Sequence, residues 1–235
     1  MELSKREQLF AALAPSFIAM PHLTKGNRND EIWRECWKFV DQAMYHSVNS
    51  ESPAQIANRW IQKGFVILDT ETTGLGNDDE IVEVSIIAAD GAVLLNTLVK
   101  PPVSIPAAAT AIHGITDEMV ADAPSWMEIL PTVIDLTSKG WVAYNASFDF
   151  RMLQQAGGRL AKDSEDIRYP ECVMQLYAEH NGEWDPRRRK YKWKRLVEAA
   201  KSLDVDVGEG VAHRALYDCR MTLGVIQAIA GGAAE

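Results

Sequence analysis

The hexapeptide DTETTG places two carboxylates two residues apart, directly after an apolar run. Asp69 and Glu71 are these acids, and residues 65–69 read FVILD. Because positions i and i+2 of a strand share a face, both carboxylates are expected to point to one place at the strand's C-terminal end. The hexapeptide contains no basic residue, and two such close carboxylates repel each other unless a cation lies between them. It therefore predicts half of a cation site.

Two further acids and a histidine stand where they could complete that site. Asp149 follows the apolar run WVAYN of residues 141–145, at the start of an expected helix. Asp218 lies one turn into the last expected helix, and His213 lies in the loop or first turn before it. Carboxylates without paired His or Cys favour Mg²⁺ or Mn²⁺ over zinc, and histidines titrate near neutral pH. Each residue alone also fits surface charge, a helix cap or a structural role, so their joint order carries the prediction.

The elements expected around these residues describe a mixed α/β domain. After the strand at residues 65–69, two β-rich runs are joined by Asp90-Gly91, which is a hairpin signal. Prolines are expected to keep the segment 101–116 out of regular helix, apart from a possible cap at its end. The alternation that follows predicts strands and helices in turn. The expected segments are a short helix from 117, a helix at 126–140 with a Ser125/Glu128 capping box, a strand at 141–145, and helices at 149–158, 171–180, 194–203 and 215–230.

Residues 1–62 are expected to form a helical N-terminal extension of unknown role, before a domain at residues 63–235. Trp33, Trp37 and Met44 fall on one face of a helix in this extension. The chain has no apolar stretch of 18 residues and no signal-type N-terminus, so we expect no membrane segment and a cytoplasmic location. Its 3 cysteines form no Cys-x-x-Cys pair, which argues against disulfides and zinc.

One segment is strongly basic within an acidic chain of net charge −9. Residues 187–195, RRRKYKWKR, hold 7 cations and no anion. A charge run is often only a solvated face. Tyr191 and Trp193 favour a nucleic-acid surface instead, because rings stack on bases while cations meet phosphates. The residues predicted to contact a nucleic-acid strand are Arg187, Arg188, Arg189, Lys190, Lys192 and Trp193.

The ordered motifs resemble those of the DnaQ-like (DEDDh) family of 3′-to-5′ exonucleases, which includes the proofreading epsilon subunit of DNA polymerase III. VILDTETTGL resembles the first exonuclease motif, VAYNASFD the second and HRALYD the third. PAAATAIHGITDEMV is similar to the His-Gly-Ile segment that the family carries between them. The resemblance runs from about residue 64 to residue 230 and leaves the N-terminal extension unexplained.

The resemblance implies a ribonuclease H-like mixed β-sheet flanked by helices. It also implies that the four acids hold two Mg²⁺ or Mn²⁺ ions, that His213 acts as general base, and that nucleoside 5′-monophosphates leave stepwise from a 3′ end. By the same resemblance the 3′-terminal nucleotide would be contacted by Thr72, Thr73, Gly74, Leu75, Ile112, His113, Asn145 and Phe148. One departure is Tyr144, where many relatives have His before the Asn of the second motif.

The expected substrate is single-stranded DNA or the frayed 3′ ends of duplex DNA. An exoribonuclease acting on RNA ends or short oligoribonucleotides is the alternative, because the catalytic motifs do not read the sugar. A different class of function is an inactive binding module on a nuclease fold, which the presence of all five site residues disfavours. Residues 1–62 could also dock a protein partner.

Overall fold

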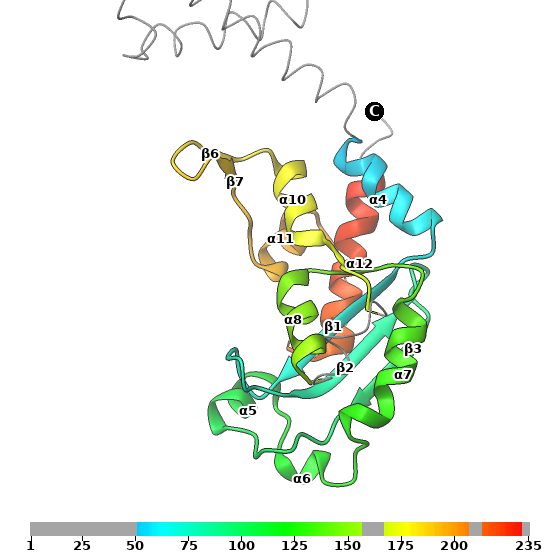
Figure 1. The fold of residues 1–235 in the computed structure, drawn as a ribbon. Helices are drawn as coiled ribbons and strands as arrows, with labels where there is room; N and C mark the ends of the chain where they lie inside the picture. Colours follow the sequence, from blue (N-terminus) through cyan, green and yellow to red (C-terminus); the bar gives the residue numbers. More distant parts are fainter. Residues whose placement is uncertain (1–50, 157–166, 207–212, 232–235) are drawn as a thin grey trace, which may run out of the picture. The chain divides into compact units, whose positions relative to one another are not determined.

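A five-stranded mixed sheet forms the centre of the compact unit that starts at Ser52 in a computed structural model, which describes residues 51–156, 167–206 and 213–231 (Figure 1). The strand order is β3-β2-β1-β4-β5. The pairs β1/β2 and β2/β3 are antiparallel, whereas β1/β4 and β4/β5 are parallel. The sheet confirms the predicted mixed α/β fold. Its strands are β1 (Val66–Thr72), β2 (Ile81–Ile87), β3 (Val93–Leu98), β4 (Trp141–Ala143) and β5 (Glu171–Cys172).

Helices cover both faces of this sheet, and a separate two-stranded hairpin follows α10 in the chain and lies beside that helix (Figure 1). The hairpin consists of β6 (Trp184–Asp185) and β7 (Lys190–Tyr191). No described helix is long and apolar enough to cross a membrane. The helices are α4 (Pro53–Gln62), α5 (Ala107–His113), α6 (Asp117–Val120), α7 (Trp126–Thr137), α8 (Ala146–Ala156), α10 (Val173–Asn181), α11 (Leu196–Ser202) and α12 (Ala215–Gly231).

The alternation of side chains along β1 divides the core into two layers. Val66 and Leu68 pack against α7 and α8, whereas Ile67 packs against α4, α10, α11 and α12. Since side chains alternate between the faces, Asp69 and Glu71 lie on the face that α12 covers. The strand pattern thus directs both acids toward the helix that carries Asp218.

The compact unit around the sheet begins at Ser52. It includes α4, whose Ala57 and Trp60 are buried in the core with α12. This helix lies on the N-terminal side of the domain boundary expected at residue 62. The rest of the predicted helical extension lies outside the described residues.

Local sequence signals correctly predicted a hairpin turn and the start of a helix. β2 and β3 join through a turn in which Gly91 has φ 89°, as the Asp90-Gly91 signal indicates. The capping box at α7 is present, since a Glu128 carboxylate oxygen accepts a hydrogen bond from the Ser125 backbone N–H at 2.8 Å.

Two of the sequence-based predictions were wrong. The segment 101–116 contains α5, because Pro106 stands only at the N-cap, the helix begins with three alanines, and Gly114 ends it in the left-handed conformation. The predicted helix at 171–180 begins with the short strand β5, since Glu171 and Cys172 pair with β4. No apolar pattern in the sequence predicted either this edge strand or the β6–β7 hairpin.

Candidate active site

Three carboxylates converge at the C-terminal end of β1. Asp69 and Glu71 come from the strand and Asp218 from the first turn of α12, and each offers an oxygen within 4.8 Å of the others. All three side chains are partly exposed. The β1/β2 register shifts between Glu71 and Thr72, so the irregularity ends regular pairing at the site. Oxygen ligands this close suit a hard divalent cation.

The fourth predicted acid, Asp149, borders this cluster from α8. It is buried, and its Oδ1 accepts a hydrogen bond from the Thr70 hydroxyl at 2.9 Å. Thr70 lies between Asp69 and Glu71 and points to the other face of the strand, the face that α8 covers. Asp149 also raises the pKa of Asp69, which places the two carboxylates in one electrostatic group.

Burial raises the pKa of every acid in this group. Burial is the largest cause in each case, and neighbouring carboxylates add to it for Asp69, Glu71 and Asp218. The pKa of Glu71 is raised to about 8 and that of Asp149 to about 7, while the pKa of Asp69 lies well above its usual range. Bound cations would reverse this effect, because they favour the ionised form.

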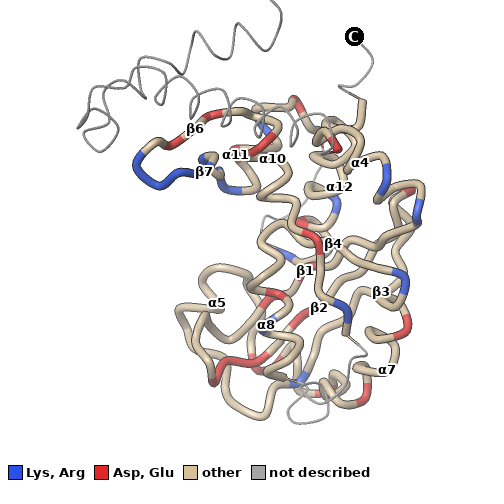
Figure 2. Tube along the Cα trace, turned by 45° about the horizontal axis from the view of Figure 1, so that its top comes forward, with Lys and Arg blue, Asp and Glu red and all other residues tan. Residues whose placement is uncertain are grey.

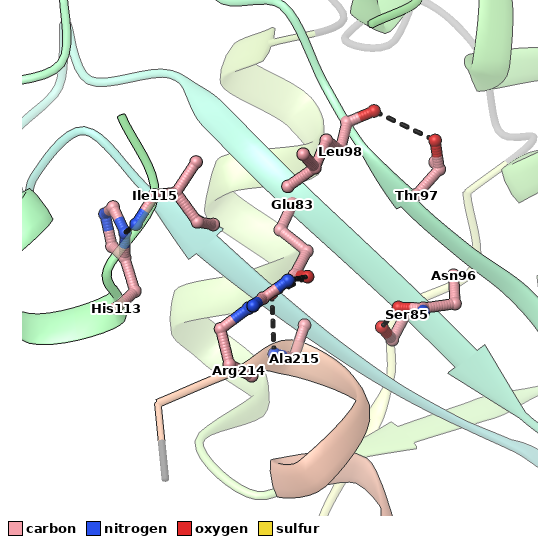
Figure 3. Close-up of polar contacts among 9 residues, drawn as sticks. All are labelled: Glu83, Ser85, Asn96, Thr97, Leu98, His113, Ile115, Arg214 and Ala215. Carbon is pink, nitrogen blue, oxygen red and sulfur yellow. Dashed lines mark hydrogen bonds and ion pairs between the residues drawn. The ribbon is translucent and has the colours of Figure 1, made fainter. Parts of the chain in front are cut away.

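An ion pair between the buried Glu83 of β2 and the partly exposed Arg214 lies at the start of α12 (Figure 3). Arg214 Nε donates to both carboxylate oxygens of Glu83, at 3.1 and 3.0 Å, and Ala215 N donates to Oε2 at 3.0 Å. Glu83 stands directly opposite Glu71 in the β1/β2 pairing. The pair therefore fixes the N-terminus of α12 to the strand beside the acids. Sequence reasoning missed it, although a glutamate inside the apolar run of β2 was a signal.

His213 immediately precedes this ion pair. Its side chain is exposed, and its backbone has φ 62°, a left-handed conformation that histidine adopts more readily than most residues. Burial raises the pKa of Asp218, whereas the charge and the backbone N–H of His213 lower it. His213 thus lies beside the carboxylate cluster at the start of α12.

Seven of the eight predicted nucleotide contacts line one cavity next to Glu71. It has a volume of about 330 Å³. Leu75 is 80% exposed and Ile112 60% exposed, so this cavity presents apolar surface to solvent. Asn145 instead lines a neighbouring cavity. The seven are Thr72, Thr73, Gly74, Leu75, Ile112, His113 and Phe148.

The loop after β1 is held by contacts that the sequence did not reveal. The Asp79 carboxylate accepts hydrogen bonds from the Thr73 hydroxyl at 2.9 Å and from Gly76 N at 2.6 Å. Arg151 of α8 donates to the carbonyl oxygens of Leu75 and Gly76 at 3.0 and 2.8 Å. A β-carbon on Gly74 would lie 2.6 Å from the Asp79 carboxylate, so any other residue there would displace that carboxylate. These contacts fix one wall of the cavity.

Tyr144, the residue that departs from the family motif, packs in the hydrophobic core. Its hydroxyl donates to the carbonyl oxygen of Lys194 at 2.9 Å, and its ring is buried with α10 and α11. It ties the end of β4 to the segment before α11.

The basic segment forms the tip and outgoing strand of the β6–β7 hairpin, where Figure 2 shows a continuous run of cationic residues. Asp185 accepts hydrogen bonds from the backbone N–H groups of Arg187 and Arg188 at 2.9 and 3.1 Å, which shapes the turn. Lys192 is paired with Glu183 at 2.7 Å. The hairpin contributes no residue to the carboxylate cluster.

The sheet and its carboxylate edge have the architecture of a nuclease that cleaves from chain ends, and comparison with known proteins agrees. The exonuclease family model RNase T matches residues 66–226. The chain belongs to this RNase T exonuclease family, which is DnaQ-like and of the DEDD class.

Relatives and solved structures support the assignment. An uncharacterized exonuclease of Escherichia phage 186 is 49% identical over 195 residues, covering 80% of this chain and 99% of that protein. Exodeoxyribonuclease 10 of Escherichia coli is 37% identical over 168 residues, covering 68% of this chain and 66% of the relative. A structure of exonuclease X in complex with 5′ overhanging duplex DNA has a TM-score of 0.53 and 29% identity, and covers 73% of this chain and 93% of that chain. The protein is therefore an exonuclease, a hydrolase.

Proposed function

We propose that the protein is a 3′-to-5′ exodeoxyribonuclease that uses two Mg²⁺ or Mn²⁺ ions and releases nucleoside 5′-monophosphates. The observation that carries the proposal is the cluster of Asp69, Glu71 and Asp218, whose oxygens lie within 4.8 Å of one another beside the buried Asp149. Such a set of acids fits divalent cations better than any other ligand. The sequence similarity to exodeoxyribonuclease 10 and to exonuclease X supports DNA as the substrate.

The four acids would hold the metal ions, which supply Lewis-acid stabilisation of the charge that develops on the reacting phosphate oxygens. His213 is exposed beside Asp218, where it can accept the proton of the attacking water. The bond from the water oxygen to phosphorus forms as the bond to the preceding nucleotide's 3′ oxygen breaks. The cavity beside Glu71 would hold the terminal nucleotide, with Leu75, Ile112 and Phe148 as its apolar contacts.

Product analysis on end-labelled strands tests this proposal. With Mg²⁺ or Mn²⁺, a 5′-labelled single-stranded DNA is expected to shorten stepwise, and a 3′-labelled one is expected to release labelled mononucleotide at once. Matched RNA and blunt duplex DNA, digested in parallel, give the sugar and strand preference. Release from the 5′ end, or digestion that continues in EDTA, would overturn the assignment. The variant Asp69→Asn is the matched inactive protein.

A further inference from the structure

A second cavity, lined by aromatic side chains, lies between α10 and the β6–β7 hairpin. Its volume is about 420 Å³, and its walls include Trp184, Tyr191, Trp193 and Met174. None of these residues belongs to the carboxylate cluster or to the cavity beside Glu71. It is a separate feature that the hydrolytic reaction itself does not explain.

The rings of this aromatic cavity are unusually exposed for their size. Trp184 is 50% exposed, Tyr191 40% and Trp193 51%. Trp184 and Tyr191 pair across the hairpin edge to face, with ring centroids 5.2 Å apart. That contact holds the two rings in place while leaving ring surface open. Exposed aromatic groups that line a hollow are typical of ligand sites.

The charge beside the aromatic cavity selects an anionic ligand. Its charged lining residues are Lys190 and Glu179, and the hairpin tip adds a run of cationic residues that outnumber this one acid (Figure 2). Arg188 makes one long, exposed contact with Asp185 at 3.9 Å. Arg187, Arg189 and Lys190 form no ion pair with any residue that the structure describes. Open rings next to unpaired cations match a single-stranded nucleic acid, whose bases stack while its phosphates meet the cations.

A third cavity adjoins the aromatic cavity. It measures about 360 Å³ and shares Met174 and Gln175 with the aromatic cavity. It is also lined by residues 145–147, where α8 begins, and by the acidic Glu171. The next residue, Phe148, lines the cavity beside Glu71. The three cavities are therefore related through shared or consecutive lining residues, from the one beside Glu71 to the one at the hairpin.

We propose that single-stranded nucleic acid follows this route, with the nucleotides on the 5′ side of the scissile end held in the aromatic cavity. Its bases stack on Trp184 and Trp193, and its phosphates meet Arg187, Arg189 and Lys190. The inference rests on the proposed function, because the 3′ end must lie at the carboxylates for the 5′ side to reach the hairpin. It adds a strand site that short substrates cannot reach.

Substrate length provides the test. The double variant Trp184→Ala/Trp193→Ala is compared with the parent on a thymidine dinucleotide and on an oligothymidylate of about 12 nucleotides. The ratio of kcat/KM for the long substrate to that for the dinucleotide is expected to fall about 100-fold, since each of the two stacked bases contributes a factor of roughly ten. Trp184→Phe/Trp193→Phe keeps the rings and is expected to restore most of the ratio. Met119→Ala, an exposed apolar truncation on α6, is the control.

The outcomes separate this inference from the function on which it rests. If neither substrate is hydrolysed by the parent, the proposed function fails. If both are hydrolysed and the ratio does not change in the double variant, only the strand site fails. Tryptophan fluorescence of the Asp69→Asn protein gives a direct reading: oligothymidylate is expected to quench it, and less so after the double substitution. Equal quenching by poly-glutamate would assign the aromatic cavity to an acidic protein partner and overturn the inference.

Discussion

Arg214 holds Glu83 through both carboxylate oxygens on the strand next to Glu71. The Glu83 side chain is only 3% exposed, whereas that of Arg214 is 36% exposed. The two partners therefore depend on each other unequally. Without the arginine, a buried carboxylate would remain unpaired beside the acidic cluster, while without the glutamate a partly exposed arginine side chain would remain in contact with water.

This asymmetry predicts unequal effects of the two substitutions on stability. Arg214→Met is expected to lower the free energy of unfolding by about 3 kcal/mol, the cost of leaving a buried charge unpaired. Glu83→Gln is expected to cost clearly less, and the double variant less than the sum of the two. Urea unfolding of the parent, the two single variants and the double variant, as a double-mutant cycle, measures these changes in the free energy of unfolding. Additive effects, or a larger loss from Glu83→Gln, would contradict this account.

The strand and helix patterns explain which parts of the site could be predicted. The period of two along β1 places Asp69 and Glu71 on one face, and the helix starts place Asp149 and Asp218 within one turn of the sheet edge. Glu83 and Arg214 are 131 positions apart, and no local pattern joins them. The β6–β7 hairpin was equally hidden, because strands of two residues leave no alternating apolar signal.

Metal binding should stabilise the folded protein and depend on each cluster acid. Mn²⁺ at about 100 times its dissociation constant is expected to add about 2.7 kcal/mol to the free energy of unfolding. Asp218→Asn should remove most of this gain and lower exonuclease activity at least about 100-fold, since it deletes a metal ligand. Thermal unfolding with and without Mn²⁺ measures the gain. Asp122→Asn, an exposed acid on the loop after α6, should behave as the parent.

The raised pKa values predict how stability changes with pH in EDTA. The pKa of Glu71 is about 8 and that of Asp149 about 7, both above the value of about 4 in the unfolded chain. The folded protein therefore keeps protons that the unfolded chain has released. The stability that these groups contribute is complete below about pH 4 and is lost as the pH rises through 7 to 8.

Melting temperatures measured from pH 5 to 9 test whether stability falls as the pH rises. In EDTA they are expected to fall across that range, and Mg²⁺ should reduce the fall because it binds the ionised acids. Asp69→Asn/Glu71→Gln should flatten the EDTA profile, which separates the cluster from the general effect of net charge. A profile that rises with pH in EDTA, or one that the double variant leaves unchanged, would refute the assignment.

Asp79 should affect substrate binding without affecting the metal site. Its carboxylate fixes Thr73 and Gly76 in the loop that walls the nucleotide cavity, but it is not part of the acid cluster. Asp79→Ala is expected to raise KM about tenfold, since two hydrogen bonds that order the loop are lost. The melting shift caused by Mn²⁺ should stay as in the parent. A lost shift would show that Asp79 supports metal binding instead.

The arginines of the hairpin tip should govern the salt dependence of strand binding. For single strands, log K changes with log salt by about −0.7 per phosphate contact. Replacing Arg187, Arg188 and Arg189 by Ala in the inactive Asp69→Asn protein should weaken binding of oligothymidylate and make this slope shallower by about 2 if each arginine meets one phosphate. The triple variant Lys63→Ala/Lys139→Ala/Lys201→Ala removes the same charge from exposed sites elsewhere and should leave the slope near that of the parent. Equal slopes in the two triple variants would mean that the tip acts only through the overall charge, because a direct contact releases counterions where it forms and a distant charge does not.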